Sequence, residues 1–431
     1  MAAAYFESGR RPLATFELYV RRLPENRSFL LTAGLEQALQ YLENLRFNSD
    51  EIDFLRRQPV FAHVSAPFFE YLEQFRFTGE VWAMAEGTPA FAQEPLLRVT
   101  APIIEAQLVE TFVLTALTFQ TMIATKAARV VEAAQGRAVV EFGTRRAHGP
   151  EAGVLAARAA YVGGCVGTSN VEAGFRFGVP AFGTLAHSFV MSFHDELESF
   201  REMERIFPDH SVLLVDTYDT MAAIEKIVSA GLRPRGVRLD SGNLAELAKQ
   251  ARQRLDQAGL KDTKIFASGD LNEYLIAELI AQGGPIDMFG VGTELATSKD
   301  APSLSGVYKL VEIIEGGEHS YRVKLSHDKA TYPGAKQLFR FFRDGQFERD
   351  VIARQGERYA GAEPLLECVM RNGRRLAKSP PIHDVQQRAR QQLGRLPERF
   401  RRLRDAEPYP VEVSEELRDL EAAERGRHTQ V

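Results

Sequence analysis

The residues best suited to chemistry stand in short polar clusters, each placed directly after an apolar run. An apolar, β-branched run, a tight polar turn and a helical stretch together are the sequence form of a strand–helix unit, and its repetition builds a parallel sheet. In α/β barrels the loops after the strands form the ligand face, so these clusters are expected to meet at one site. The seven runs are residues 139–146, 165–170, 180–188, 212–220, 236–243, 264–270 and 288–295.

The run 236–243 carries a charged pair, Arg238 and Asp240, at alternating strand positions. Alternate positions project to the same side of a strand, and the turn Ser241-Gly242 that follows can leave backbone N–H groups free. A guanidinium grips phosphate oxygens and a carboxylate accepts hydrogen bonds from a diol, so this pair suits a ligand with phosphate and sugar hydroxyls. The alternative is an ion pair that only stabilises the strand end.

Two later clusters place glycine at a strand-to-helix junction. They contain Ser268, Gly269 and Asp270 in one case and Gly290, Gly292 and Thr293 in the other. Glycine lets the backbone approach an anion, and free amides at the start of a helix favour negative charge. The last strands of a barrel are the usual phosphate position, although each junction alone is consistent with a simple turn. The chain has neither a complete dinucleotide fingerprint nor a Gly-Lys-Ser/Thr phosphate loop.

His187 is the titratable side chain of greatest interest, because it follows a strand and a Gly-Thr turn. An imidazole there can act as an acid or base, as a ligand, or as a nucleophile that takes up a phosphoryl group. A structural histidine is the alternative. No second His, Cys or carboxylate stands at ligand spacing, so the sequence leaves the identity of any protein-bound metal site unknown.

Three further side chains fit an anionic, flat ligand. Arg145 and Arg146 follow Phe142, and adjacent arginines suit a pyrophosphate while the ring can stack on a planar group.

Asp216 and Asp219 could bind hydroxyls or Mg²⁺, or could cap the following helix.

The surrounding pattern predicts an α/β fold in three segments. Residues 1–105 mix helices, such as 32–45, with strands 13–22 and 94–102, and form the first part of a sandwich-like α+β domain. Residues 106–305 form an α/β barrel that carries the site. Residues 306–431 return to that first domain through hairpins around Gly316-Gly317 and Asp344-Gly345 and end in a helical, basic tail.

Composition narrows the class of partner. A formal net charge of −5 gives no general electrostatic reason to bind nucleic acid or an anionic membrane. The longest uncharged stretch, 111–125, is too short and polar to span a bilayer. Two cysteines and no secretory signal pattern favour a cytoplasmic protein, with Cys165 as a core residue.

Eight segments of the chain, which include the polar clusters described above, together closely resemble nicotinate phosphoribosyltransferase. The similarity runs in order from about Met1 to Leu338, and the combination is specific although each piece alone is not. The segments are EFGTRRAHGPEAG, GTSNVEAGFRFGVP, GTLAHSFV, VDTYDT, VRLDSGNL, SGDLNEY, FGVGTEL and KLSHDKATYPGAKQL. The resemblance implies an irregular, incomplete TIM-like barrel of the type II phosphoribosyltransferases beside a sandwich-like α/β domain, in a homodimer with sites at the interface.

The resemblance also implies a reaction of NAD salvage. Nicotinate and 5-phosphoribosyl 1-pyrophosphate (PRPP) would give nicotinate mononucleotide and pyrophosphate, with ATP hydrolysis coupled through a phosphohistidine at His187. Mg²⁺ would enter with PRPP and pyrophosphate. Arg238 and Asp240 would hold the phosphoribosyl group, and Asp216 would assist with its hydroxyls or Mg²⁺.

The remaining roles follow the same resemblance. Phe142 would stack on the pyridine ring, and Arg145 would contact its carboxylate or the phosphates, with Arg146 beside it. The other expected substrate contacts come from the turns after the strands: Ser169, Asn170, Ser241, Gly242, Ser268, Gly269, Asp270, Gly290, Gly292 and Thr293.

Base preference rests on the position of Ser169. In the sister family that uses nicotinamide, a carboxylate there accepts from the amide, whereas a neutral residue avoids repelling the carboxylate of nicotinate. Glu172 follows Ser169 by three positions.

Family members also carry, ahead of the segment that matches MAAAYF, an Asp-x-Tyr stretch whose tyrosine covers the base; the printed chain begins at Met1. A nicotinamide-preferring enzyme and a non-catalytic phosphoribosyl-ligand sensor are the alternatives.

Overall fold

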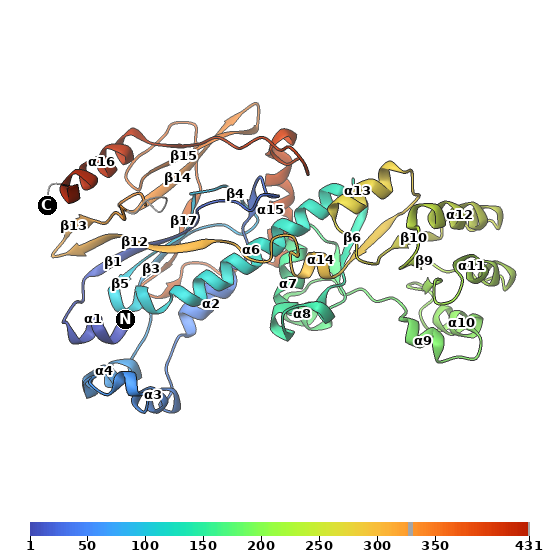
Figure 1. Ribbon diagram of the computed structural model, residues 1–431, viewed down its shortest axis with the longest axis horizontal. Helices are drawn as coiled ribbons and strands as arrows, with labels where there is room; N and C mark the ends of the chain where they lie inside the picture. Colours follow the sequence, from blue (N-terminus) through green and yellow to red (C-terminus); the bar gives the residue numbers. More distant parts are fainter. Residues whose placement is uncertain (326–330, 430–431) are drawn as a thin grey trace. The chain divides into compact units, whose positions relative to one another are not determined.

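The computed structural model describes residues 1–325 and 331–429, and the chain divides into two compact units. The first unit comprises Met1–Thr121, Ser303–Pro381 and Gln387–Val431, so both ends of the chain contribute to it. The second comprises Met122–Pro302 and Ile382–Gln386. Two helices, α6 (Glu110–Ala133) and α15 (Ile382–Arg395), contain residues of both units (Figure 1).

The main sheet of the first unit is antiparallel, with strand order β13-β12-β1-β5-β3-β17-β18. β1 lies between β5, which belongs to the segment Met1–Thr121, and β12, which belongs to the segment Ser303–Pro381 (Figure 1). The strands are β1 (Leu13–Val20), β3 (Glu80–Met84), β5 (Pro95–Pro102), β12 (Gly306–Glu315), β13 (Glu318–Tyr321), β17 (Leu366–Arg371) and β18 (Arg374–Arg375).

A second sheet of this unit has the order β16-β14-β15-β19, and β2 pairs with β4 in a small ribbon. The strands are β2 (Leu30–Leu31), β4 (Pro89–Ala90), β14 (Lys336–Arg343), β15 (Gln346–Arg354), β16 (Glu363–Pro364) and β19 (Val411–Val413). The helices are α1 (Ala2–Glu7), α2 (Leu35–Asn44), α3 (Ser49–Arg56), α4 (Ala66–Glu73), α5 (Ile103–Leu108) and α16 (Glu415–Thr429). The predicted hairpin around Asp344-Gly345 is confirmed, and both turn residues have positive φ, as such tight turns require.

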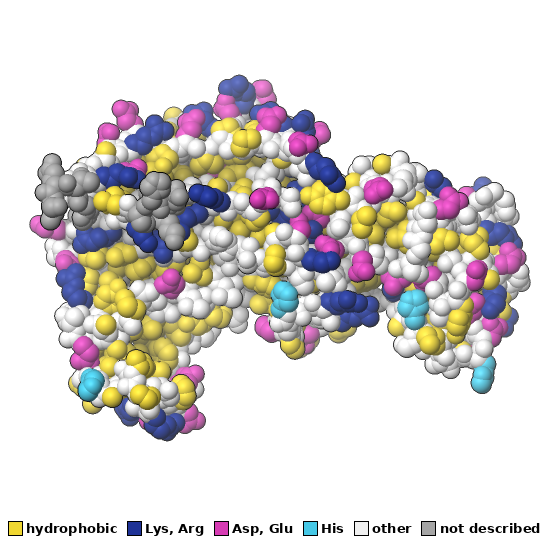
Figure 2. Space-filling model, viewed as in Figure 1, with side chains coloured by type: hydrophobic (Ala, Val, Ile, Leu, Met, Phe, Trp, Pro, Cys, Tyr) yellow, Lys and Arg dark blue, Asp and Glu magenta, His cyan; other side chains and the backbone are white. Residues whose placement is uncertain are grey.

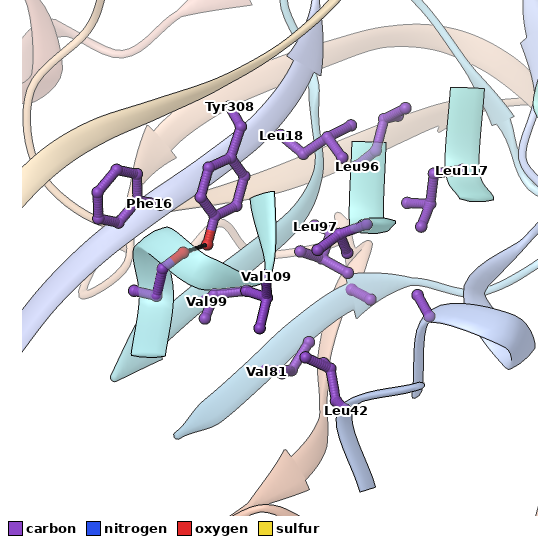
Figure 3. Close-up of a cluster of buried hydrophobic side chains, with 14 of the residues drawn as sticks. Phe16, Leu18, Leu42, Val81, Leu96, Leu97, Val99, Val109, Leu117 and Tyr308 are labelled. Atoms are coloured by element: carbon purple, nitrogen blue, oxygen red, sulfur yellow. Dashed lines mark hydrogen bonds between the residues drawn. The ribbon is translucent and has the colours of Figure 1, made fainter. Parts of the chain in front are cut away.

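The core of the first unit lies between the main sheet and the helices packed on it (Figure 3). Phe16 of β1 stacks on Tyr308 of β12, with ring centroids 4.9 Å apart. The Tyr308 hydroxyl donates to the carbonyl of Ala106 at 3.0 Å, which satisfies the one polar atom of that fully buried ring. Leu97 of β5 is completely buried opposite Leu18.

The second unit is a six-stranded parallel sheet with the order β7-β6-β11-β10-β9-β8. β7 and β8 stand at opposite edges, so the sheet is open and does not close into a complete barrel. The strands are β6 (Ala138–Glu141), β7 (Gly167–Thr168), β8 (Val212–Leu214), β9 (Gly236–Leu239), β10 (Lys264–Ala267) and β11 (Met288–Val291). The helices are α7 (Pro150–Val162), α8 (Val171–Phe177), α9 (His187–Met191), α10 (Glu196–Ile206), α11 (Thr220–Ser229), α12 (Leu244–Gln257), α13 (Glu273–Ala281) and α14 (Thr293–Ala296).

Six of the seven apolar runs form strands of this sheet, which confirms the predicted series of strand–helix units. The run 180–188 differs: it makes a single bridge from Ala181 to Thr168 and then leads into α9. Its Pro180, Gly183 and the exposed Phe182 explain the difference, because proline removes a ladder donor and the stretch buries little apolar surface. The motif 324–338 includes residues 326–330, which lie outside the described residues.

Lys and Arg side chains alternate with Asp and Glu over much of the face seen in Figure 2, as the small net charge leads one to expect. In the part of the chain that the structure describes, no helix has the length and apolar content to cross a bilayer.

The core predicts the cost of a cavity at Leu97. Replacing Leu97 by Ala should lower the free energy of unfolding by about 2–5 kcal/mol, because a fully buried side chain leaves a void among packed neighbours. Leu376→Ala is the control, since Leu376 is 52% exposed and its loss should change that free energy by less than about 0.5 kcal/mol. Urea denaturation measures both; equal effects would contradict this assignment of the core.

Candidate active site

The candidate residues of the second unit lie at the carboxyl ends of neighbouring parallel strands. Phe142 follows β6, Asp240 follows β9, Ser268 follows β10 and Gly292 follows β11. Because parallel strands end at the same edge of a sheet, residues that are 24 to 150 positions apart in the chain are brought together by strand pairing. The following helices begin in the same polar clusters: Asp219, Asn243 and Asn272 accept from backbone N–H groups as N-caps of α11, α12 and α13.

Arg238 is the most fully bonded side chain of the site. Its Nη2 donates to Asp240 Oδ1 at 2.9 Å, and its Nε donates to Ser268 Oγ at 2.9 Å. Its Nη1 donates to Thr184 Oγ1 at 2.5 Å and to the Leu185 carbonyl at 3.2 Å. These bonds use four of the five N–H donors of a guanidinium, so Arg238 can offer a ligand one donor and its charge.

Asp240 is the centre of the cluster. Its Oδ1 accepts from Arg238 and from the Ser268 hydroxyl, and its Oδ2 lies 3.8 Å from His187 Nε2. Burial by itself would raise the pKa of Asp240, but the hydrogen bond from Ser268 and the charge and hydrogen bond of Arg238 outweigh it, so the pKa is lowered. Asp240 is therefore an anion at neutral pH, with a 24% exposed side chain that a ligand can reach.

Asp216 has one carboxylate oxygen in use and one without a partner. Its Oδ2 accepts from the Asp240 backbone N–H at 3.0 Å and from the Ser241 hydroxyl at 2.6 Å. Its Oδ1 is buried and has no hydrogen-bond partner. An unpaired buried carboxylate oxygen is costly, so this atom is a natural acceptor for a ligand hydroxyl or for a water on a bound cation.

The structure brings His187 to this cluster from α9. Its Nδ1 lies 3.1 Å from Thr217 Oγ1, while its Nε2 faces Asp240. The His187 side chain is 42% exposed, which leaves it open to a second reactant. His187, Arg238 and Asp240 are thus near neighbours at one partly exposed place, as the sequence predicts.

Phe142 covers one flank of the site, and Gly290 makes room for its ring. A Cβ atom at Gly290 would lie 2.5 Å from a Phe142 ring carbon, so no larger residue fits there without moving the ring. The guanidinium carbon of Arg238 lies 5.9 Å from the centroid of the same ring. Gly290 therefore acts by shaping the wall rather than by exposing its backbone.

Two consecutive residues of the turn after β10 have positive φ angles. Gly269 has a φ of +96° and Asp270 a φ of +48°. A Cβ at Gly269 would come within 2.1 Å of the Asp240 carbonyl oxygen, so glycine is required by conformation and by space. Gly269, Asp270, Ser241 and Gly242 are exposed beside the cluster, and Gly292 and Thr293 are half-buried.

The loops after β6 and β7 carry the other candidates. Arg145 and Arg146 lie on a short 3₁₀ helix, Thr144–Arg146, with exposed side chains, and Ser169 is exposed as well. Asn170 is buried and used internally: its Oδ1 caps α8 and its Nδ2 donates to Thr144 Oγ1 at 3.1 Å. Asn170 thus links the two loops instead of facing a ligand.

Glu141 connects the loop after β6 with β7 through hydrogen bonds to its carboxylate. This fully buried carboxylate accepts from the Gly143 backbone N–H and from Thr168 Oγ1. Burial raises the pKa of Glu141, and its two hydrogen bonds counteract part of that rise. Sequence reasoning missed Glu141, Thr168, Thr184 and Thr217. Their presence in the polar clusters was a signal, but their partners become visible only in three dimensions.

The described residues offer no ready-made metal centre. Within residues 1–325 and 331–429, no three His, Cys, Asp or Glu side chains are grouped so as to hold a metal ion. Asp216 Oδ1 fits a cation that arrives with an anionic ligand, because Mg²⁺ commonly keeps waters and takes one or two carboxylates plus phosphate oxygens. Cys165 is buried, and burial raises the pKa of its thiol, which agrees with a core residue.

Known families cover most of the chain. Residues 1–118 match the nicotinate phosphoribosyltransferase (NAPRTase) N-terminal domain, and residues 354–421 match the nicotinate phosphoribosyltransferase C-terminal domain. Residues 123–324 match the quinolinate phosphoribosyl transferase C-terminal domain.

Individual relatives give the same picture. A nicotinate phosphoribosyltransferase of Mycobacterium tuberculosis is 46% identical over 97% of this chain and 90% of its own length. One of Bacillus subtilis is 39% identical over 96% of this chain and 91% of its own. The crystal structure of human nicotinic acid phosphoribosyltransferase has a TM-score of 0.86 at 30% identity and covers 98% of both chains.

The bonding of Asp240 predicts a low titration midpoint. Because its pKa is lowered on folding, ionised Asp240 stabilises the folded state above the unfolded pKa of about 3.9, and that stabilisation is lost as the pH falls through the folded pKa. A ¹³C-carboxyl NMR titration, assigned with Asp240→Asn, should give a midpoint below about 3.9. Ser268→Ala should move it upward because a hydrogen bond to the carboxylate is lost.

Ser192→Ala is the control for this titration, since the exposed Ser192 hydroxyl donates to the Phe189 carbonyl and takes no part in the cluster. It should leave the Asp240 midpoint unchanged. A wild-type midpoint at or above about 3.9 would contradict the proposed bonding.

Proposed function

This chain belongs to the nicotinate phosphoribosyltransferase family, and we propose that it joins nicotinate to PRPP to form nicotinate mononucleotide and pyrophosphate in NAD salvage. The observation that carries the proposal is the meeting of Arg238, Asp240, His187 and the unpaired Asp216 oxygen at one edge of the parallel sheet. The carboxylates of Asp240 and Asp216 suit the hydroxyls of a phosphoribosyl group, and the neighbouring Phe142 ring suits a pyridine ring.

The reaction is a substitution at the anomeric carbon of PRPP. The pyridine nitrogen of nicotinate forms a bond to that carbon, and the bond from the carbon to the pyrophosphate oxygen breaks, so pyrophosphate leaves with the electron pair. Positive charge develops on the sugar in the transition state, and a preorganised carboxylate stabilises it better than reorienting water would. Asp240 meets this need because Arg238 and Ser268 keep it ionised and fixed.

The substrate groups can be assigned to the strand ends. Asp216 Oδ1 would accept from a ribose hydroxyl or contact a water on Mg²⁺ carried in by PRPP, where the ion neutralises the leaving group. Gly269, Asp270, Gly292 and Thr293 would surround the 5-phosphate. Since most of its donors are occupied, Arg238 would act on the phosphoribosyl group chiefly through its charge.

The base would lie against Phe142. An exposed Arg145 can form a forked pair with the nicotinate carboxylate or with the phosphates, and Arg146 adds positive charge beside it. Ser169 is exposed and neutral at the position where a carboxylate would repel nicotinate. These features favour the acid over the amide.

ATP coupling would pass through His187. A ring nitrogen of His187 would attack the γ-phosphorus of ATP and release ADP, and water would later break the phosphorus–nitrogen bond to give phosphate. A phosphoryl group adds about −2 charge at neutral pH, which would attract arginine side chains of neighbouring loops and strengthen PRPP binding. We also propose a cytoplasmic homodimer with sites at the subunit interface, as the family resemblance implies.

The product assay is the primary test. Incubation of the protein with PRPP and Mg²⁺ should yield nicotinate mononucleotide and pyrophosphate from nicotinate, with a much lower kcat/KM for nicotinamide. Liquid chromatography with mass detection measures both products. Higher kcat/KM for nicotinamide would assign the protein to the sister activity, and PRPP binding without turnover would make it a phosphoribosyl-ligand sensor.

His187→Ala should abolish the stimulation of transfer by ATP and the ³²P labelling from γ-labelled ATP, because the nucleophilic nitrogen is gone. Transfer without ATP should remain detectable, since Arg238 and Asp240 are intact. His194→Ala is the control, because His194 is an exposed histidine seven residues further on, and it should be labelled like the wild type. Labelling that persists in His187→Ala would remove His187 from this role.

A further inference from the structure

A charged cluster with a buried centre includes residues that closely follow the turns after β10 and β11. It consists of Lys126 and Arg129 from α6, Glu273 from α13, Glu294 from α14, and Asp300. None of these side chains belongs to the site described above. Lys126, Arg129 and Glu273 have side chains that are at most 2% exposed, and their burial needs a reason because desolvation opposes it, whereas Glu294 and Asp300 at the edge are 13% and 20% exposed.

Lys126 is the centre of this cluster, and its side chain is 1% exposed. Its ammonium lies 2.5 Å from Glu273 Oε2, 2.9 Å from Asp300 Oδ1 and 4.0 Å from Glu294 Oε2. The three carboxylates come from two different strand–helix units. The ammonium of Lys126 therefore connects the segment after β10 with the segment after β11, by ion pairs with Glu273 and Glu294 and by a hydrogen bond to Asp300.

Arg129 adds a second contact one turn along α6. Its Nε donates to Glu273 Oε1 at 3.1 Å, and its Nη2 donates to the Tyr274 hydroxyl at 3.1 Å. Glu273 is completely buried and uses one carboxylate oxygen for each of the two cations. The start of α13 is thereby held in both position and orientation.

The positions of these carboxylates give the cluster its significance. Glu273 is the first residue of α13 and stands three residues after Asp270, whereas Glu294 directly follows Thr293. In the turn 268–270, Asp270 is a non-glycine residue with a positive φ, a conformation that costs free energy and is held by the surrounding structure. The two turns expected to face the 5-phosphate of PRPP are thus each anchored, a few residues downstream, on the same lysine.

We propose that Lys126 is a positioning residue for phosphate binding, which sets the spacing between the turns 268–270 and 290–293. The proposal rests on the proposed function, because it takes the ligand of these turns to be the 5-phosphate of PRPP. A buried ion cluster is not needed for stability alone, since apolar side chains of similar volume often serve as well. Two backbone segments that must approach one phosphate group, however, require a relative position that apolar packing specifies less sharply.

The test separates PRPP binding from nicotinate binding. Lys126→Met should raise the KM for PRPP roughly tenfold or more, because displaced phosphate contacts are lost, while the KM for nicotinate stays within about twofold. Isothermal titration of PRPP should show the same loss of affinity. Lys126→Arg, which keeps the charge, should restore part of it. Glu294→Gln removes one outer contact of the cluster and should give a smaller rise in the KM for PRPP with a nearly unchanged melting temperature.

Lys336→Met is the matched control in the first unit. Lys336 is also a buried lysine paired with a completely buried glutamate, Glu17, at 2.7 Å. The substitution Lys336→Met should lower the melting temperature and leave the KM for PRPP unchanged. The proposal fails if Lys126→Met and Glu294→Gln keep wild-type PRPP affinity, or if Lys336→Met changes it equally. Because titration needs no turnover, failure here is distinguishable from a wild-type protein that forms no nicotinate mononucleotide.

Discussion

The pairing of Arg238 with Asp240 is the interaction on which the candidate site depends. Arg238 lies on β9 and Asp240 directly follows it; the hydrogen bond from Ser268 and the 2.9 Å contact with Arg238 together lower the pKa of Asp240, which burial alone would raise. Three neighbouring side chains contact this pair. Ser268 bonds to both members, Asp216 binds the Asp240 backbone, and His187 faces the free carboxylate oxygen.

Two layers of support surround that pair in the second unit. The nearer layer consists of uncharged hydroxyl groups, such as those of Thr184 and Thr217, which orient Arg238 and His187 without adding charge. The deeper layer consists of buried carboxylates. Glu141 ties together the loops after β6 and β7, and Glu273 ties the segment after β10 to α6. The buried carboxylates of Glu141 and Glu273 thus fix the loops that carry the candidate site residues, and such fixed positions are what preorganisation of a site requires.

Much of the second unit follows from local sequence patterns. Apolar runs ending in glycine and polar residues predicted the parallel strands and placed most candidate residues at their carboxyl ends, where strand pairing makes them neighbours. The pattern was wrong for residues 180–188, whose apolar character suggested a strand but whose proline and exposed Phe182 leave only one bridge. Asn170 and Gly290 were expected to contact substrate; in the structure Asn170 caps α8 and Gly290 lies against the Phe142 ring.

The sequence by itself determined the class of fold, the order of the strand–helix units and the family, because these depend on periodicity and on motifs that are local in the chain. Only the tertiary structure decided which oxygen of Asp216 is unpaired, which nitrogen of His187 faces Asp240, and that Lys126 reaches three carboxylates. These properties depend on atoms separated by up to 174 positions along the chain. Such distances are set by how strands pair and helices pack, and no local pattern encodes them.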